Sequence, residues 1–424
     1  MTFFLFIFDY LCSVHDIKSM KNLFYILLFG TSIPVLAQPC SQASYLEQLL
    51  RIQPEMQAKI QLHEKIIANF DLSQTSEERN VYLIPIVVHV VYENDAENIS
   101  ESQIRSQIEI LNLDFRKKNY DVTFIPDVFT NISTDIGIEF CLANIDPQGK
   151  KSSGITRTKT EFSNIGSSFA LGNRRRIYYS DLGGEDVWDT QKYLNIWVCS
   201  IGGGTLGLAL GTLANAKEDG VLVDYQAFGT NGTAKAPYSL GRTCTHEIGH
   251  FFNLKHLWGD TENCTGDDLV ADTPTQSAPY FGCPTYPQES CGTSNMFMNF
   301  MDYTDDSCRK IFTKGQKNRV LVTLLSLRPS LLNAQVCQFC KDTRSDLCIF
   351  PNPTNNFLTF NLSENQQVTV KIFDELGRFY FEEQLSPPVT GKSIFLKNLP
   401  SGIYIAKIQD ASGRNDIQKF IISK

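Results

Sequence analysis

The chain lacks two features that define large classes of protein: a surplus of basic residues, and a long apolar run beyond its N-terminus. Its formal net charge of −8 argues against nucleic-acid binding, which needs a basic surface. No stretch of about 20 apolar residues follows the first 40 positions, so we expect no transmembrane segment in the mature protein. The 424 residues are too many for one ordinary domain.

The N-terminal region predicts export. Residues 20–37 begin with Met20 and Lys21, continue as an apolar run, and end in Val35-Leu36-Ala37, which is typical of a secretory signal and its cleavage site. We interpret Met20 as the true start of the protein and residues 1–19 as an extension from a wrongly assigned start codon. A single membrane anchor made of both apolar patches is disfavoured because charged residues lie between them. We therefore expect a secreted or cell-surface protein in which disulfides can form.

Residues 38–80 are polar and show helical spacing of leucine and isoleucine, and their position suggests a propeptide. Such segments can keep an enzyme inactive through a side chain, such as a cysteine or an aspartate, that blocks the active site. Cys40 is the only cysteine in this segment, but nothing around it looks like a cysteine-switch motif. The sequence therefore favours a helical segment that assists folding over a blocking role for Cys40.

Histidine is also scarce, with six in the chain, yet three of them lie in HEIGHFFNLKH, residues 246–256. His246 and His250 are four residues apart, so a helix places both rings on one face. His256 can join them only if the helix ends first, and Asn253 tolerates the left-handed conformation that ends helices. The pattern predicts three nitrogen ligands around one zinc ion.

Glu247 follows the first histidine and would lie beside the metal. A zinc site with three protein ligands keeps a position for water, and a carboxylate at this offset can take its proton. HExxH alone occurs by chance, and a lone histidine is more often structural. The third histidine and the helix-ending residue make the metal site much the stronger interpretation.

With these residues the chain resembles the metzincin metalloproteases, whose signature is HExxHxxGxxH followed by a Met-turn. Asn253 replaces the usual glycine, and NFMDY (299–303) supplies the Met-turn with Met301. Residues 81–332 look like the bacterial branch of the pappalysin family, through the segments IPIVVHVVY, LNIWVCSIGGGTLG, DGVLVDYQAFGT, LWGDTENC, DDLVADTP and NFMDYTDDSC. The resemblance implies an α/β (α+β) catalytic domain with a mixed sheet and an active-site helix.

The resemblance also implies roles near the metal. Met301 would pack beneath the zinc, and Tyr303 would donate to the oxyanion, although its hydroxyl could simply fix the turn. Residues 205–209 would form an edge strand for the substrate. The glycine-rich sequence there is no phosphate loop, because no GK[ST] follows.

Four cysteines cluster between the third histidine and the Met-turn region, and they allow three pairings. Their spacings contain no CxxC, which disfavours a zinc knuckle. The resemblance implies the interleaved pairs Cys264–Cys291 and Cys283–Cys308. Cys337 and Cys340 do form a CxxC, but a redox role is weak without a βαβ context.

An acidic loop after His256 is a candidate calcium site. Asp267, Asp268, Asp272 and Thr273 offer the oxygen ligands that hard cations require. The spacing is not that of an EF-hand, and a solvated loop is the alternative. Calcium is favoured because relatives carry it in this loop.

Asp305 and Asp306 follow the Met-turn, where metzincins line the pocket for the side chain after the cut bond. A carboxylate there would attract Arg or Lys, with Asp306 expected to matter more than Asp305. Two aspartates facing solvent are the alternative.

Beyond a linker at 333–346, residues 347–424 alternate in strand-like fashion and suit a small all-β sandwich. FPNPTNN, DELGR, LPSGIYIAKI and the final KFIISK resemble the C-terminal sorting domain of the type IX secretion system, with a generic adhesion sandwich as the alternative. We expect a zinc endopeptidase that meets protein or peptide substrates and the secretion machinery. The rivals are a surface-displayed binding or adhesion protein with a relic metal site and a hydrolase of non-peptide amides.

Overall fold

The computed structural model describes residues 40–424 except 71, 73–80, 171–173, 262, 334–335, 338–346, 351–353, 355–356, 363–366, 388, 390–391, 397–398, 414 and 423–424. The predicted extension and signal peptide lie outside the described residues. Within the described part, no helix is long and apolar enough to cross a membrane.

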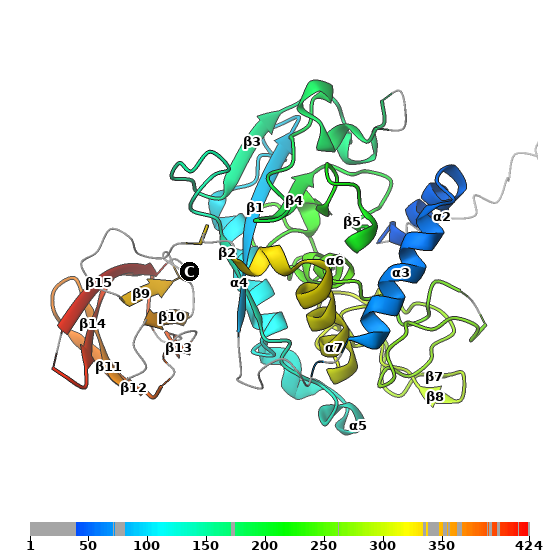
Figure 1. Cartoon of the computed structure of the whole chain (residues 1–424). Helices are drawn as coiled ribbons and strands as arrows, with labels where there is room; N and C mark the ends of the chain where they lie inside the picture. The colour runs from blue at the N-terminus through cyan, green and yellow to red at the C-terminus, as the bar shows by residue number, and fades with distance from the viewer. Residues whose placement is uncertain are drawn as a thin grey trace, which may run out of the picture. The chain divides into compact units, whose positions relative to one another are not determined.

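A mixed sheet in the order β2-β1-β4-β6-β5 forms the centre of the first domain (Figure 1), and β3 also pairs with β1. The strands other than β5 run parallel, and β5 is antiparallel to β6 at the edge of the sheet. The bounds are β1 Tyr82–Tyr92, β2 Ile138–Leu142, β3 Ile155–Lys159, β4 Leu194–Cys199, β5 Gly207–Ala209 and β6 Gly220–Asp224.

The central strand β1 is buried on both faces, which explains its nearly continuous apolar sequence. Ile86 and Val88 belong to the main core, together with residues of helices α4 and α6, while Val87 and Val91 belong to separate clusters. His89 is fully buried in the same strand and hydrogen-bonds Thr156 and Asn195, so it is a core residue.

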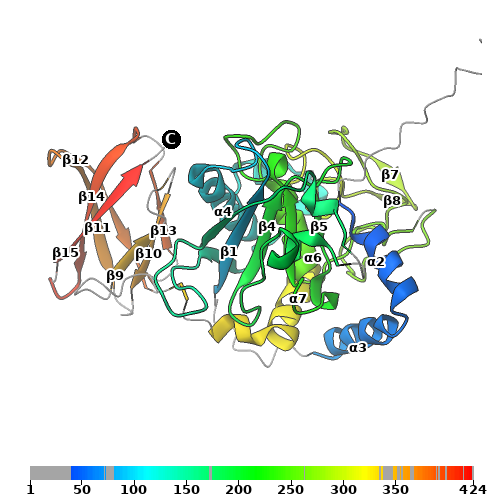
Figure 2. The ribbon, with the colours of Figure 1, turned by 90° about the horizontal axis from the view of Figure 1, so that it is seen from above.

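The helices that support the site follow from local sequence signals. Ser100 caps α4 by accepting a hydrogen bond from the Gln103 amide, and serine is among the residues preferred at this position. Figure 2 shows α4 and α6 beside the sheet, and α7 nearby. The helices of this domain are α4 Glu101–Phe115, α5 Asp127–Thr130, α6 Arg242–Phe251 and α7 Lys314–Val322, and a small hairpin pairs β7 Glu289–Ser290 with β8 Thr293–Ser294.

The segment before the sheet forms two helices, α2 Gln42–Ile52 and α3 Met56–Asn69. They are separated at Pro54, which lacks the amide hydrogen needed to continue a helix. The helical pattern predicted for this segment is therefore present.

The C-terminal strands form two antiparallel sheets around a core of their own, as the predicted β-sandwich requires. One sheet has the order β13-β10-β9 and the other β12-β11-β14-β15. The bounds are β9 Leu347–Phe350, β10 Phe357–Leu362, β11 Val368–Asp374, β12 Phe379–Leu385, β13 Lys392–Phe395, β14 Gly402–Asp410 and β15 Asn415–Ile422.

Candidate metal centre and active site

Helix α6 ends where the histidine spacing requires. Asn253 is left-handed, with φ of 67°. Its amide donates to the His250 carbonyl (2.8 Å), and the Leu254 amide donates to the Gly249 carbonyl (2.9 Å). These two bonds form a Schellman motif, which turns the chain back and brings His256 to the other two histidines.

The three imidazoles converge through their Nε2 atoms. These atoms are separated by 3.1 Å for His246 and His250, 3.0 Å for His250 and His256, and 3.3 Å for His246 and His256. All three rings are buried. Burial and the neighbouring imidazoles lower the pKa of His246 well below its usual value and that of His250 to about 3, so both rings are held neutral.

The opposite ring nitrogens fix the tautomers. Nδ1 of His246 lies 2.7 Å from the Phe300 carbonyl, and Nδ1 of His250 lies 2.8 Å from the Leu254 carbonyl. Nδ1 of His256 lies 2.5 Å from the Asp260 carboxylate. Each Nδ1 must donate to its oxygen, which leaves three Nε2 lone pairs facing one another.

Three converging lone pairs need a cation. For Zn–N bonds of about 2.0–2.1 Å, a tetrahedral ion separates its ligand atoms by about 3.3 Å, close to the spacing of these nitrogens. The residues present therefore fit a zinc ion. Asp260 orients His256 from the end of the LWGD segment, a role not predicted from the sequence, although its position four residues after His256 was visible.

Cys40 lies at this centre, contrary to the interpretation favoured from the sequence. Among the described residues, Cys40 and the three histidines are the one group whose ligand atoms all lie within 4.8 Å of one another. The Cys40 thiol is buried and lies 3.6 Å from Glu247 Oε2. Burial raises the pKa of this thiol, and the Glu247 carboxylate raises it further. A bound cation would oppose both effects, because thiolate is the form that binds metals.

The backbone around Cys40 pairs with the edge strand. Cys40 forms a parallel bridge with Gly207, and the Ser41 amide donates to the Gly207 carbonyl (3.2 Å). A Cβ on Gly207 would lie 2.5 Å from Glu247 Oε1, so glycine lets β5 pass directly over the Glu247 carboxylate. Gly207 thus allows β5 to lie close to Glu247 and also forms the bridge with Cys40.

Glu247 is fully buried, and its Oε1 has no hydrogen-bond partner within the described part of the chain. Burial raises its pKa to about 8, while the Cys40 thiol and the charge of Arg309 act in the opposite direction. An unpaired acceptor beside a metal centre is suited to binding a water molecule and its proton.

The Met-turn residues lie against this centre. Met301 is fully buried, and a Cβ on Gly249 of α6 would lie 2.5 Å from its sulfur, so Met301 packs directly under the helix that carries the histidines. The Tyr303 ring lies 4.8 Å from that of His256, and its hydroxyl donates to the Cys40 carbonyl (3.1 Å).

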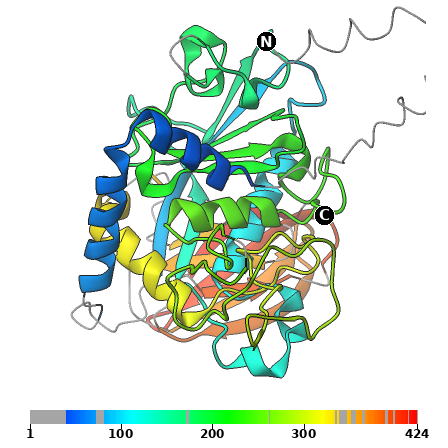
Figure 3. The ribbon, with the colours of Figure 1, turned by 90° about the vertical axis from the view of Figure 1, so that its right-hand side faces the viewer.

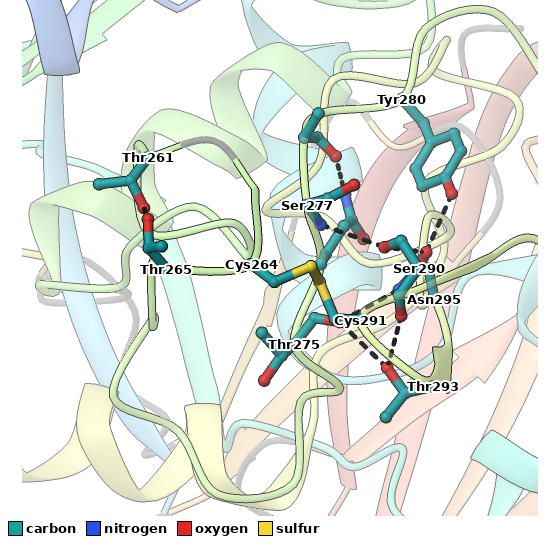
Figure 4. Close-up of a disulfide and its surroundings, with 12 residues drawn as sticks. Thr261, Cys264, Thr265, Thr275, Ser277, Tyr280, Ser290, Cys291, Thr293 and Asn295 are labelled. Atoms are coloured by element: carbon teal, nitrogen blue, oxygen red, sulfur yellow. Dashed lines mark hydrogen bonds between the residues drawn. A yellow bond between two sulfur atoms is a disulfide. The ribbon is translucent and has the colours of Figure 1, made fainter.

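Disulfides tie the long loop between His256 and the Met-turn. The structure pairs Cys264 with Cys291 (Figure 4) and Cys283 with Cys308, the interleaved pattern expected from the resemblance. A third disulfide joins Cys141 to Cys337, a residue considered from the sequence only as part of a CxxC. Cys340 lies outside the described residues.

The candidate calcium residues are split into two places. Both Asp268 oxygens lie 2.8 Å from the Thr273 hydroxyl, and burial raises the pKa of Asp268 to about 7. Asp272 instead accepts from the Thr313 hydroxyl and the Gly315 amide at the start of α7. Asp267 is exposed and accepts from the Leu269 amide. Asp268 and Thr273 are brought together, whereas Asp272 stabilises a helix terminus.

The two aspartates after the Met-turn also differ. Asp305 is half-buried, whereas Asp306 is fully buried and ion-paired with Arg309, with Nη2 and Oδ1 2.5 Å apart. The sequence pattern alone did not point to Arg309.

The N-terminal helices make a second contact with the domain, through residues of α3 that lie more than 20 positions after Cys40 in the sequence. Glu64 of α3 receives two hydrogen bonds from Arg319 (3.0 and 2.5 Å), and Arg319 Nε also donates to the Asn253 carbonyl (2.6 Å). His63 Nδ1 lies 2.8 Å from the Thr212 hydroxyl. In Figure 3 the blue helices cross the face of the domain that carries α6.

A mixed sheet with an edge strand, two histidines on a helix and a third just beyond its end, a buried glutamate and a methionine turn define a metzincin-like metallopeptidase. Residues 178–325 match the family described as Pregnancy-associated plasma protein-A, and residues 348–423 match the secretion system C-terminal sorting domain. The chain belongs to the pappalysin family of metalloendopeptidases, and its sorting domain directs it through type IX secretion to the cell surface or exterior.

Two solved structures from Tannerella forsythia are similar. A mutant of promirolysin is 40% identical, with a TM-score of 0.62, and the match covers 70% of this chain and 96% of that one. Mature mirolysin in complex with a cleaved peptide is 42% identical, with a TM-score of 0.56, over 61% and 96% of the two chains. An extracellular metalloprotease from Arthroderma benhamiae is 28% identical over 56% of this chain and 75% of its own.

Proposed function

We propose that this chain is a zinc-dependent endopeptidase, made as a zymogen, that cleaves peptide bonds with a metal-activated water. The convergence of three Nε2 lone pairs beside Glu247 carries this proposal. A zinc ion bound by His246, His250 and His256 would lower the pKa of a coordinated water. The cleaved peptide held by mature mirolysin supports a peptide as substrate.

The chain's own residues have separate tasks in this reaction. Glu247 accepts the proton of the attacking water and passes it to the leaving amine, for which its raised pKa is suited. Tyr303 donates to the oxyanion. Its hydroxyl already donates to a backbone carbonyl, that of Cys40, which is the same kind of acceptor as the carbonyl of a peptide to be cut.

Removal of the metal tests this function. Treatment of the activated enzyme with a zinc chelator should abolish cleavage of internal bonds in a peptide library, and one equivalent of zinc should restore it. A binding protein with a relic site would cut no peptide in either state. A hydrolase of non-peptide amides would cleave only small amides, so a mass-spectrometric profile of the library separates the three hypotheses.

We propose that Cys40 keeps the precursor inactive by occupying the fourth ligand position, with its backbone paired to β5. The ion pair between Glu64 and Arg319 gives the propeptide a second attachment. Residues 38–80 therefore act as a propeptide held at two points, and the site opens fully only when both are released. Promirolysin, to which this chain is similar, is by its name also a precursor, which supports this proposal.

Calcium in the loop after His256 is a further part of the proposal. The buried Asp268 carboxylate, with Thr273 beside it, is the group that a bound cation would stabilise most, since burial disfavours its charged form. Asp267 is exposed and could complete such a site only if its side chain turned inward. Asp272 could do so only by giving up its hydrogen bonds to Thr313 and Gly315 at the start of α7.

The expected preference for Arg or Lys after the cut bond depends on Asp305 and Asp306. Asp305 offers a half-buried carboxylate to such a side chain. Asp306 can contribute only in competition with Arg309, its present partner. We therefore propose a modest preference that rests mainly on Asp305, the reverse of the order expected from sequence.

Export should require residues 347–424, since these match the sorting domain. A chain truncated after residue 346 should remain in the periplasm of a host with type IX secretion, folded and active on lysis. The secreted mature enzyme should lack the domain by intact-mass measurement. As a control, the same residues fused to an unrelated periplasmic protein should export it. Secretion of the truncated chain at the full rate would contradict the assignment.

A further inference from the structure

Arg309 and Asp306 form a buried ion pair in the segment that follows the Met-turn. Asp306 is 0% exposed and Arg309 is 3% exposed. The pair forms between residues of one short segment, and neither partner hydrogen-bonds the propeptide in the described structure. We therefore expect it to persist in the mature enzyme.

The pair is attached to the helix that carries His246 and Glu247, because Asp306 accepts a hydrogen bond from the Arg242 amide, at the first residue of α6. The segment begins at Tyr303, whose ring lies 4.8 Å from that of His256 and 5.8 Å from that of His246. At its other end, the charge of Arg309 contributes to the lowered pKa of His246 and opposes the rise in the pKa of Glu247. A disulfide from Cys308 to Cys283 holds this end of the segment.

Asp306 has little acceptor capacity left for a substrate. Its Oδ2 accepts hydrogen bonds from the amides of Leu240 and Arg242 (2.8 and 3.2 Å) at the start of α6. Its Oδ1 accepts from Arg309. A carboxylate offers about four acceptor positions, so roughly one remains. The negative charge is balanced by a guanidinium that cannot lose its proton.

We propose that Arg309 determines the charge of the pocket for the side chain after the cut bond, by acting as an internal cation that neutralises Asp306. This inference rests on the proposed endopeptidase function. A substrate Arg or Lys would have to displace Arg309 or lie beside a like charge, whereas an uncharged side chain meets neither cost. The wild-type pocket therefore accepts uncharged residues about as well as basic ones, with Asp305 as the remaining source of any basic preference.

Four variants of the activated enzyme test the idea through the ratio of kcat/KM for two peptides that differ only in Arg or Leu after the cut bond. Arg309→Met removes the internal cation, and Arg309→Gln does so while keeping a hydrogen-bond donor for Asp306. Arg309→Lys keeps the charge and serves as the matched control. The double variant Asp306→Asn/Arg309→Met removes both charges.

The wild-type Arg/Leu ratio should lie within about threefold of one, and Arg309→Met and Arg309→Gln should each raise it about tenfold or more, as expected for a charged hydrogen bond gained by the substrate. Arg309→Lys and the double variant should stay near wild type. A wild-type enzyme that already favours Arg tenfold, or a ratio that does not follow the charge of the pair, would overturn the inference even if Arg309→Met failed to fold. Failure of every form to cut either peptide would instead reject the endopeptidase function on which it rests.

Discussion

Replacement of Glu247 by alanine should reduce peptide cleavage by the activated enzyme about 10³-fold or more, the scale of effect of losing a general base. The zinc content should remain at one ion per chain, because the three histidines and their oxygen partners are unchanged. Peptidase assays beside elemental analysis of the same preparation measure both quantities.

The matched control is Glu97→Gln, which alters a buried glutamate whose carboxylate accepts hydrogen bonds within its own turn, from the Glu93 amide and the Asn94 side chain. It should retain activity. Substantial cleavage by Glu247→Ala would remove Glu247 from the base role, whereas loss of zinc in that variant would show that Glu247 also supports the metal.

The second large effect should come from Cys40, the residue proposed to block the metal in the precursor. Replacement of Cys40 by alanine should raise the activity of the unprocessed precursor roughly 10²-fold, since one of two linked attachments of the propeptide is lost. The gain should remain below the activity of the mature enzyme, because β5 and the Glu64–Arg319 ion pair still hold the segment.

Cys199→Ala is the control for this variant, because Cys199 is also a free and buried cysteine but lies in β4. It should leave the precursor inactive. The mature forms of the wild type and of Cys40→Ala should be identical in activity, since the propeptide is absent from both. A Cys40→Ala precursor as inactive as the wild type would show that the helices alone provide latency.

The histidine trio could be predicted because the helix repeat and the helix-ending Asn253 are local properties of eleven residues. The mixed sheet and the β-sandwich were likewise predicted. The apolar run of β1 indicates a strand buried on both faces, and the alternating pattern near the C-terminus indicates strands buried on one face.

The position of Cys40 could not be predicted, because no local motif marks it and 207 positions separate it from Glu247. The same holds for Cys141 and Cys337, which are 196 positions apart. Asp306 illustrates a different limit. Its sequence context shows an acidic loop, but whether a carboxylate is free depends on its neighbours in space, and Arg309 is the neighbour that decides it.

The most direct test of a zinc centre blocked by Cys40 is X-ray absorption at the zinc edge of the purified precursor. The structure predicts three nitrogen neighbours at about 2.0–2.1 Å and one sulfur at about 2.3 Å. In the mature enzyme the sulfur should be replaced by an oxygen. A precursor with one zinc per chain but only nitrogen and oxygen neighbours would contradict the role of Cys40, and a precursor without zinc would contradict the metal centre itself.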